Sequence, residues 1–416
     1  MEVLVAVAVV IGFYMAWNIG ANDAANSMAD AVGSKALTVM WAVILAGIFE
    51  FAGAVLVGSS VTNTIRKGII DSQAFADNPR ELAYGMCCAL LASGLWLNLA
   101  SYFGMPVSTT HSIVGAVAGA GLLLAGFANV NWMQMGQIVL SWIVSPIAGG
   151  LMAFVTFKLI SRFILAKDHP AVAARVGVPV CVFVTFAVVI LITIFKGLKH
   201  LKLDLTGPQA LIVAVIGGLI AVAISFIPTS KKLKGAEELP LKEQLVLVEK
   251  LFTVLVIITS CTVAFAHGAN DVANAVGPLA AVVEIAKTNE IPKEVSVELW
   301  VLALGGAGII LGLATYGYRV MTVVGTRITE MTPSRGVAAD LATSVTVLVC
   351  SKMGLPISTT HTLVGAILGV GLARGITAIN RKTVKSIFTS WIITVPITAG
   401  VTILLYCLGS LLGLIG

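Results

Sequence analysis

The chain has 416 residues, of which 58% are hydrophobic and 11% charged, and its mean hydropathy is +1.00. Soluble domains carry about a quarter charged residues, so this composition excludes a globular protein with a water-covered surface. The net charge of +6 is typical of Lys and Arg enrichment on the cytoplasmic side of a membrane, not of nucleic-acid binding. We therefore expect an all-α polytopic protein, multi-pass in the cell (inner) membrane.

Apolar runs of the length that crosses a bilayer recur along the whole chain. Some of them are too short to cross alone. In chain order, the predicted membrane segments lie near residues 3–18, 36–58, 82–103, 113–128, 137–160, 174–195, 208–227, 247–266, 276–286, 297–315, 336–350, 361–373 and 386–413.

The order of these segments is that of a duplicated chain. Three stretches return in the same order at nearly one offset, which indicates an internal repeat. The pairs are GANDAANS at 20–27 with GANDVANA at 268–275, PVSTTHS at 106–112 with PISTTHT at 356–362, and SWIVSPIAGG at 141–150 with SWIITVPITAG at 390–400.

We expect a first repeat at 1–229, a charged cytoplasmic linker at 230–246 and a second repeat at 247–416. The GAND and Ser-Thr-Thr segments interrupt apolar runs with Gly, Pro and small polar residues. Broken or re-entrant helices at matching places in two repeats are typical of the binding site of a secondary transporter. The residues alone leave parallel and inverted repeats open.

Two basic clusters are expected to be cytoplasmic. Arg162, Lys167 and Arg175 follow the fifth predicted segment. The linker and its flanks hold the second cluster, which comprises Lys231, Lys232, Lys234 and Lys242.

Each GAND segment places an acid between two carboxamides, Asp23 with Asn22 and Asn26, and Asp271 with Asn270 and Asn274. An acid within the bilayer is costly, by roughly 2.5–3.5 kcal/mol on insertion scales, and is functional by default. The alternative is an Asp that caps a helix at the membrane surface. Two matched copies favour the functional interpretation, in which carboxylate and carboxamide oxygens bind an alkali cation.

Each hydroxyl run, Ser108-Thr109-Thr110 and Ser358-Thr359-Thr360, follows a proline that can end one helix and precedes an apolar run that can begin another. The prolines are Pro106 and Pro356. Hydroxyls and free N–H groups at a helix N-terminus form a ready anion site. Plain N-capping is the alternative, and the repetition at membrane depth favours an oxyanion.

The two kinds of segment predict co-transport. A divalent oxyanion beside Asp23 and Asp271 would place about four negative charges in a low dielectric, which requires cations. The neutral oxygen ligands around each Asp favour Na⁺ over H⁺, since a proton would not need them. The two Asp residues could also accept the O–H of a protonated oxyanion.

Further titratable residues inside apolar runs are candidates for coupling or for support of the site: Glu50, His111, His267, Asp340 and His361. The histidines could be purely structural, bonded to carbonyl groups inside the bundle. His267 precedes only the second GAND segment, where the first has Ile19. It therefore breaks the symmetry of the repeat.

The paired GAND and Pro-[Val/Ile]-Ser-Thr-Thr-His segments resemble those of the inorganic phosphate transporter (PiT) family over essentially the whole chain. The resemblance implies an inverted-repeat fold of about 12 membrane segments and cation-coupled symport of phosphate. It also implies phosphate contacts from the Ser-Thr-Thr runs together with Asn22, Asn270, Asp23 and Asp271, and essential roles for the two Asp residues. The compact linker suggests a prokaryotic sodium/phosphate symporter. Where the family usually has Glu, this chain has Asp340.

Na⁺-coupled phosphate symport is thus the expected function, with phosphate and Na⁺ as substrates, no enzyme activity and no cofactor. A homodimer is compatible with the sequence. The alternatives are an H⁺-coupled phosphate, metal–phosphate or sulfate permease, and an intramembrane aspartyl protease in which two Asp residues share a proton. An anion channel would often use a ring of Lys or Arg, which neither kind of segment contains.

Overall fold

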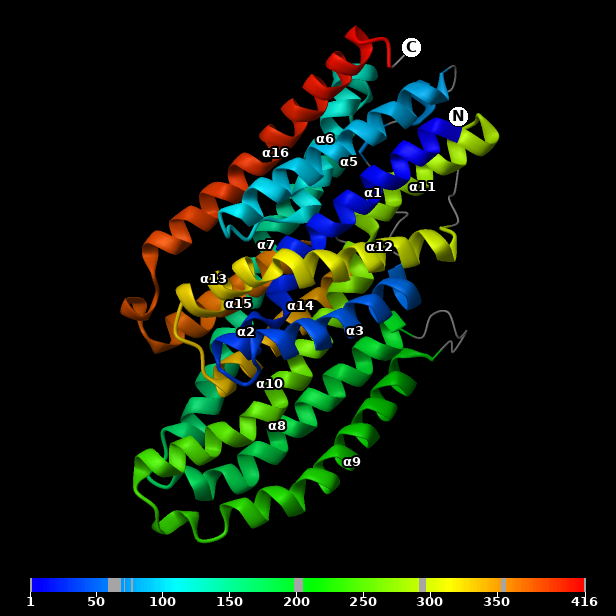
Figure 1. Cartoon of the computed structure of the whole chain (residues 1–416). Helices are drawn as coiled ribbons and strands as arrows, with labels where there is room; N and C mark the ends of the chain where they lie inside the picture. Colours follow the sequence, from blue (N-terminus) through cyan, green and yellow to red (C-terminus); the bar gives the residue numbers. More distant parts are fainter. Residues whose placement is uncertain are drawn as a thin grey trace.

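The computed structural model is all-helical (Figure 1) and describes residues 2–58, 69–70, 72–75, 78–197, 205–291, 297–352 and 357–414. Within these residues, nine helical stretches are long and apolar enough to cross a membrane. The expected multi-pass membrane protein is therefore confirmed. Pro356 lies outside the described residues.

Most predicted segments correspond to one helix each. The helices of the first repeat are α1 (Glu2–Asn22), α2 (Ala29–Gly33), α3 (Val39–Val57), α5 (Pro79–Tyr102), α6 (Thr109–Leu124), α7 (Trp132–Ile160), α8 (Pro170–Ile192) and α9 (Gly207–Leu233). Those of the second are α10 (Leu241–Asp271), α11 (Ala273–Thr288), α12 (Leu299–Gly312), α13 (Tyr318–Arg327), α14 (Pro333–Lys352), α15 (Thr359–Arg374) and α16 (Arg381–Leu411).

The GAND segments break helices, as expected. After α1 the chain makes a short 3₁₀ turn, Ala24–Met28, before α2 begins. In the second repeat α10 ends at Asp271 and α11 begins at Ala273. The Ser-Thr-Thr runs begin α6 and α15, so all four breaks lie where the sequence places them.

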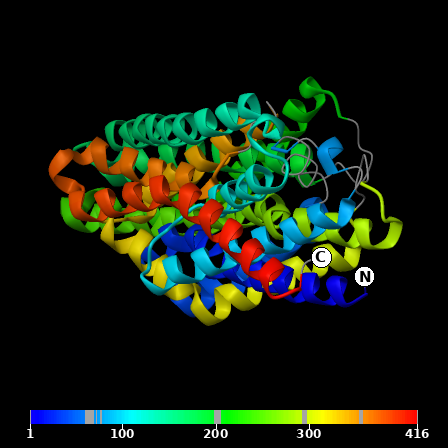
Figure 2. The same cartoon turned by 90° about the horizontal axis from the view of Figure 1, so that it is seen from above.

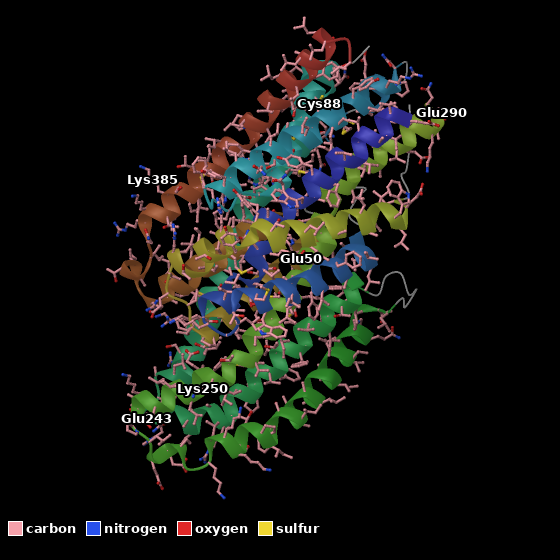
Figure 3. The ribbon with its side chains drawn as sticks, in the orientation of Figure 1. Glu50, Cys88, Glu243, Lys250, Glu290 and Lys385 are labelled. Atoms are coloured by element: carbon pink, nitrogen blue, oxygen red, sulfur yellow. The ribbon has the colours of Figure 1, made fainter. Side chains whose placement is uncertain are left out.

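The two repeats are inverted. The N-terminal end of α1 lies at the same end of the molecule as Glu290, which follows α11 (Figures 1 and 3). Glu243 and Lys250, near the start of α10, lie at the opposite end (Figure 3). Helices α1 and α10 therefore approach the centre of the molecule from opposite ends, and the chain termini lie together at one end (Figure 2).

The packing of the helices repeats this two-fold relation. Helix α1 packs on α12 as α10 packs on α3, and α6 packs on α16 as α15 packs on α7. Each of these contacts joins one repeat to the other. The halves are therefore interlocked, and neither buries its own apolar faces alone. Helices α8 and α9 have no counterpart among the described residues of the second repeat, and α8 packs against α10.

Glycines set the closeness of these contacts. A Cβ on Gly365 or Gly369 of α15 would collide with backbone of α7, at Pro146 and Gly150. The equivalent Gly115 and Gly119 of α6 meet backbone of α16 in the same way. Small residues let membrane helices approach closely, which explains the Gly-rich stretches without a role in phosphate binding.

The charged segment between the repeats is hydrogen-bonded to the start of α8. Arg175 donates to Glu237 at 2.6 Å and to the carbonyl of Leu233 at 3.0 Å. The backbone N–H of Glu237 and the Arg175 guanidinium lower the pKa of this exposed carboxyl. Both expected cytoplasmic clusters therefore lie at one end of the molecule. The helices extend further into the segment than expected, to Leu233 and from Leu241.

Candidate functional site

The ends of α1 and α10 and the beginnings of α6 and α15 meet at the centre of the molecule. The residues that converge there come from both GAND segments and both Ser-Thr-Thr runs. Their side chains are 0–5% exposed: Asp23, Asn26, Thr109, Thr110, Asp271, Asn274, Thr359 and Thr360. The structure thus places these residues in one buried site that is closed to solvent.

The Asp23 carboxylate bonds to both halves of the protein. Its Oδ2 accepts from the backbone N–H of Thr109 at 3.0 Å and from the Thr109 hydroxyl at 2.6 Å. Its Oδ1 accepts from the hydroxyl of Thr360, which belongs to the other repeat. One acid therefore links the N-terminal turns of α6 and α15.

Asp271 occupies the matching place in the second repeat. Its Oδ2 accepts from the hydroxyl of Thr359 at 2.8 Å, as Asp23 accepts from Thr109. Its Oδ1 accepts from the carboxamide of Asn270 at 2.7 Å. Each acid is thus bonded to the first threonine of its own repeat.

The second carboxamide of each GAND segment reaches across to the other repeat. Asn26 donates to the Thr360 hydroxyl at 2.9 Å. Asn274 donates to the Thr109 hydroxyl at 3.0 Å and to that of Thr110 at 3.4 Å. The carboxamide oxygen of Asn26 is buried and has no partner among the described residues.

The carboxamides that precede each Asp, those of Asn22 and Asn270, make contacts that differ from each other. Asn22 donates to the Ser101 hydroxyl and the Met105 carbonyl, both at 3.0 Å, and accepts from the N–H of Val107 at 3.0 Å. These bonds hold the extended chain between α5 and α6. Asn270 is only partly buried and bonds to its neighbour Asp271. The two-fold symmetry of the site therefore does not extend to Asn22 and Asn270.

Ser108 and Ser358 cap their helices. Each hydroxyl accepts from the N–H of the histidine three residues later, His111 or His361, at 3.2 Å. The capping alternative is thus realised for the serines, whereas the threonines that follow them lie among the site residues.

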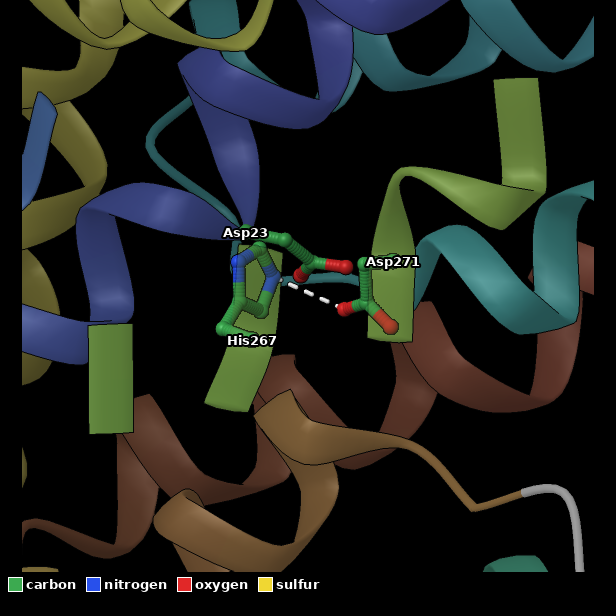
Figure 4. A group of neighbouring side chains, drawn as sticks. All are labelled: Asp23, His267 and Asp271. Carbon is green, nitrogen blue, oxygen red and sulfur yellow. Dashed lines mark ion pairs between the residues drawn. The ribbon is translucent and has the colours of Figure 1, made fainter. Parts of the chain in front are cut away.

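His267 breaks the symmetry of the site. Its Nε2 lies 2.7 Å from Oδ2 of Asp271, and its Nδ1 lies 2.8 Å from Oε2 of Glu50. Figure 4 shows His267 beside Asp23 and Asp271, and ligand atoms of the three lie within 4.8 Å of one another. Two carboxylates and one imidazole so close together can hold a cation. Glu50 also accepts from Ser27 at 3.3 Å.

The histidines of the Ser-Thr-Thr-His runs point elsewhere. The ring centroids of His111 and His361 lie 4.1 Å apart. Each ring also lies against a tryptophan, His111 against Trp142 and His361 against Trp391, at 3.5 Å between ring centroids. These four rings line an apolar groove of about 970 Å³ between α7, α15 and α16. Adjacency in sequence therefore does not bring these imidazoles to the threonine hydroxyls.

Asp340 also lies apart from the threonines. It accepts from Thr259 at 2.8 Å and from Ser260 at 2.7 Å, both on α10, and contacts Asp30 of α2. Sequence reasoning missed Asp30. The signal was available, because this acid lies seven residues after Asp23 in a segment without another charge.

Comparison with known proteins gives one consistent result. Residues 19–402 match the phosphate transporter family. The chain is 46% identical to a candidate phosphate permease of Thermococcus kodakarensis, with 99% of each chain covered. It is 42% identical to a protein of Arabidopsis thaliana named inorganic phosphate transporter 2-1, chloroplastic, over 94% of this chain and 70% of that one.

A solved structure is similar over nearly the whole fold. It is described as the sodium-dependent phosphate transporter, and the TM-score is 0.88 at 42% identity, with 98% of this chain and 99% of that chain covered.

Proposed function

Since the chain belongs to the phosphate transporter family, we propose that it is a secondary active transporter that carries inorganic phosphate across the cell membrane together with Na⁺. The observation that carries this proposal is the double role of Asp23, whose carboxylate is bonded by hydroxyls of both repeats. A group shared by both halves of an inverted repeat lies where alternating access requires the substrate site to be.

The threonines are the proposed phosphate ligands. Thr109, Thr110, Thr359 and Thr360 place their hydroxyls at the N-terminal turns of α6 and α15, where N–H groups and helix dipoles favour an anion. The hydroxyls of Thr109, Thr359 and Thr360 now donate to carboxylates, and all four hydroxyls can donate to phosphate oxygens instead. We assign Ser108 and Ser358 to orienting these turns by capping.

The proposed Na⁺ ligands are the Asp23 and Asp271 carboxylates with the carboxamide oxygens of Asn26 and Asn274. These are hard oxygen ligands of the kind alkali cations take. Phosphate with two acids would bring about four negative charges into the site, and about two or three Na⁺ would balance them. Asn22 and Asn270 then support the site, Asn22 by fixing the chain before α6.

His267 favours a second candidate, H⁺-coupled uptake of phosphate or of a metal–phosphate complex. It joins Glu50 to Asp271, so a proton on its ring would supply one positive charge that Na⁺ otherwise supplies. In the Na⁺-coupled proposal the same charge reduces the number of Na⁺ needed.

Uptake of labelled phosphate into proteoliposomes tests the proposal. An inward Na⁺ gradient and an inward H⁺ gradient are compared, each with excess unlabelled sulfate. Uptake driven by Na⁺ and indifferent to sulfate is the expected result. Uptake driven only by H⁺ would assign coupling to His267, and no phosphate uptake under either gradient would overturn the substrate.

Two structural statements belong to this proposal. We propose repeats at 1–229 and 247–416 joined by the charged linker 230–246, and a homodimer as the assembly in the membrane. Native mass spectrometry of the protein in detergent measures the number of subunits directly. A monomer alone would contradict the proposed homodimer.

A further inference from the structure

A second pair of buried acids lies between α2 and α14. The side chains of Asp30 and Asp340 are 0% exposed. Asp30 packs against α14 one turn before Asp340, where its Cβ lies 3.3 Å from the position of a Cβ on Gly336, and the two carboxyl groups interact. Both oxygens of Asp30 and Oδ1 of Asp340 lack a donor from the other described residues. Three carboxylate oxygens are therefore buried without any group that compensates their charge.

Among the described residues, no Lys, Arg or His forms an ion pair with Asp30 or Asp340. The thiol of Cys261, on α10, interacts with Asp340. Lys242, Glu243 and Lys250 lie in the first turns of α10, Arg327 is the last residue of α13, and Asp271 belongs to the central site. Other titratable groups on the helices packed against α2 and α14 contact residues away from the pair. These groups are Glu50 and His267 with each other, Glu249 with Ser334, Lys158 over Phe154, Arg319 over Tyr102 and Tyr316, His361 on Trp391, Arg175 with Glu237, and Arg335 and Arg374 with Glu330.

Two ionised carboxylates in contact inside a bilayer would repel strongly, with no water to screen them. An ionised carboxylate also only accepts hydrogen bonds, so a hydrogen bond between two acids requires a proton on one of them. We propose that Asp30 and Asp340 share one proton and so form a proton-binding site separate from the central site.

The repeat itself indicates that the fold does not require these acids. With the offset of 248 between Asp23 and Asp271, the counterpart of Asp30 is Pro278. With the offset of 250 between Ser108 and Ser358, the counterpart of Asp340 is Leu90. Their helices, α11 and α5, pack together as α2 and α14 do. The mirrored helix contact therefore forms with apolar residues at both of these positions.

The proton shared by Asp30 and Asp340 should make phosphate uptake depend on pH, an inference that rests on the proposed function. Helix α2 begins directly after the turn that carries Asn26, so the contact of α2 with α14 supports the central site. Loss of the proton at high pH places two like charges in contact and weakens that support. Phosphate uptake should then fall as pH rises, by at most about tenfold per pH unit for a single proton.

Infrared difference spectroscopy of the full-length protein tests the assignment without measuring transport. The carbonyl stretch of a protonated carboxylic acid is recorded at neutral pH in wild type, Asp30→Asn and Asp340→Asn. Glu243→Gln, which removes an exposed acid, is the control. One band of the wild type should be absent from both Asn variants and present in the control.

Two results would overturn the proposal. One is retention of every wild-type band in both Asn variants. The other is loss of the band in wild type when K⁺ is replaced by Na⁺, which would make the pair a sodium site. The second measurement follows this band in the wild-type protein, so it decides even where only one of the two Asn variants folds and assigns the band. Neither infrared measurement depends on phosphate uptake. A result that overturns the shared proton is therefore distinct from one that overturns the proposed function.

Discussion

At Asp23 one carboxylate holds the two halves of the molecule together through hydroxyl groups. The Thr109 hydroxyl donates to one of its oxygens and the Thr360 hydroxyl to the other. A neutral amide in this place keeps the size of the side chain but presents only one oxygen and no charge. The charge of Asp23 is therefore the property to test.

We expect Asp23→Asn and Asp271→Asn each to lower Na⁺-dependent phosphate uptake at least about a hundredfold, since loss of one partner of a buried charge contact costs about 3 kcal/mol or more. Proteoliposome uptake measures the effect, and thermal unfolding shows whether the variant is folded. Glu243→Gln should transport normally. Undiminished uptake in both Asn variants would remove the cation assignment.

The threonine hydroxyls should act on phosphate and not on Na⁺. Thr359→Val is expected to weaken apparent phosphate affinity about tenfold, because a hydrogen bond to a charged group is worth about 1.5 kcal/mol or more. Apparent Na⁺ affinity should stay within about twofold, a change below 0.5 kcal/mol. Ser112→Ala is the matched control, since this buried hydroxyl only bonds the Ser108 carbonyl. Unchanged phosphate affinity in Thr359→Val would leave the hydroxyls as caps.

How far sequence predicts the site depends on where each side chain points. The repeated Asp residues and the threonines could be predicted because two copies at one offset exclude chance. Asn22 and Asn26 could not be told apart, because one ends α1 and the other lies in a 3₁₀ turn. His111 follows Thr110 directly, yet one step along a helix turns it toward Trp142. Asp30 was missed because it lies between the predicted segments 3–18 and 36–58 and has no acidic counterpart in the second repeat, where Pro278 takes its place.

At the scale of elements, the helix pairs that join the repeats depend on glycine. The backbones of α15 and α7 touch at Gly369 and Gly150, and those of α6 and α16 touch at Gly119 and Ala399. The break positions and helix types were predicted well from the sequence. Which helix packs on which was not, because apolar runs in a bilayer look alike and only the small residues mark the contacts.

We therefore expect Gly369→Ala to destabilise the protein by about 1–3 kcal/mol, the usual effect of overpacking a tight contact. The new Cβ would collide with the Gly150 carbonyl of α7. Thermal unfolding in detergent measures the loss. Gly400→Ala on α16 is the control, because nothing lies within 4 Å of the added Cβ. Equal stability of the two variants would contradict the close contact between α15 and α7.

At the scale of the whole molecule, the site is closed and the repeats are inverted, so a transport cycle must open the centre to one face at a time. The two faces differ in charge. Glu243, Lys250 and Lys385 lie toward one end of the molecule, and Glu290 and both termini lie toward the other (Figure 3). The first end also carries both basic clusters, because Arg175 of one cluster bonds to Glu237 in the linker that holds the other.

The excess of Lys and Arg predicts that the end with Glu243 faces the cytoplasm. Glu243→Cys and Glu290→Cys, each exposed at a helix end, are made in a variant without the native cysteines. In intact cells an impermeant maleimide should label only Glu290→Cys, and Glu243→Cys should react once the membrane is opened. Because the two repeats are inverted, they present the same segments to opposite faces, so charge alone orients the protein. The reverse labelling would mean that the basic end faces outward, and phosphate would then enter the cell from the end that carries Lys385.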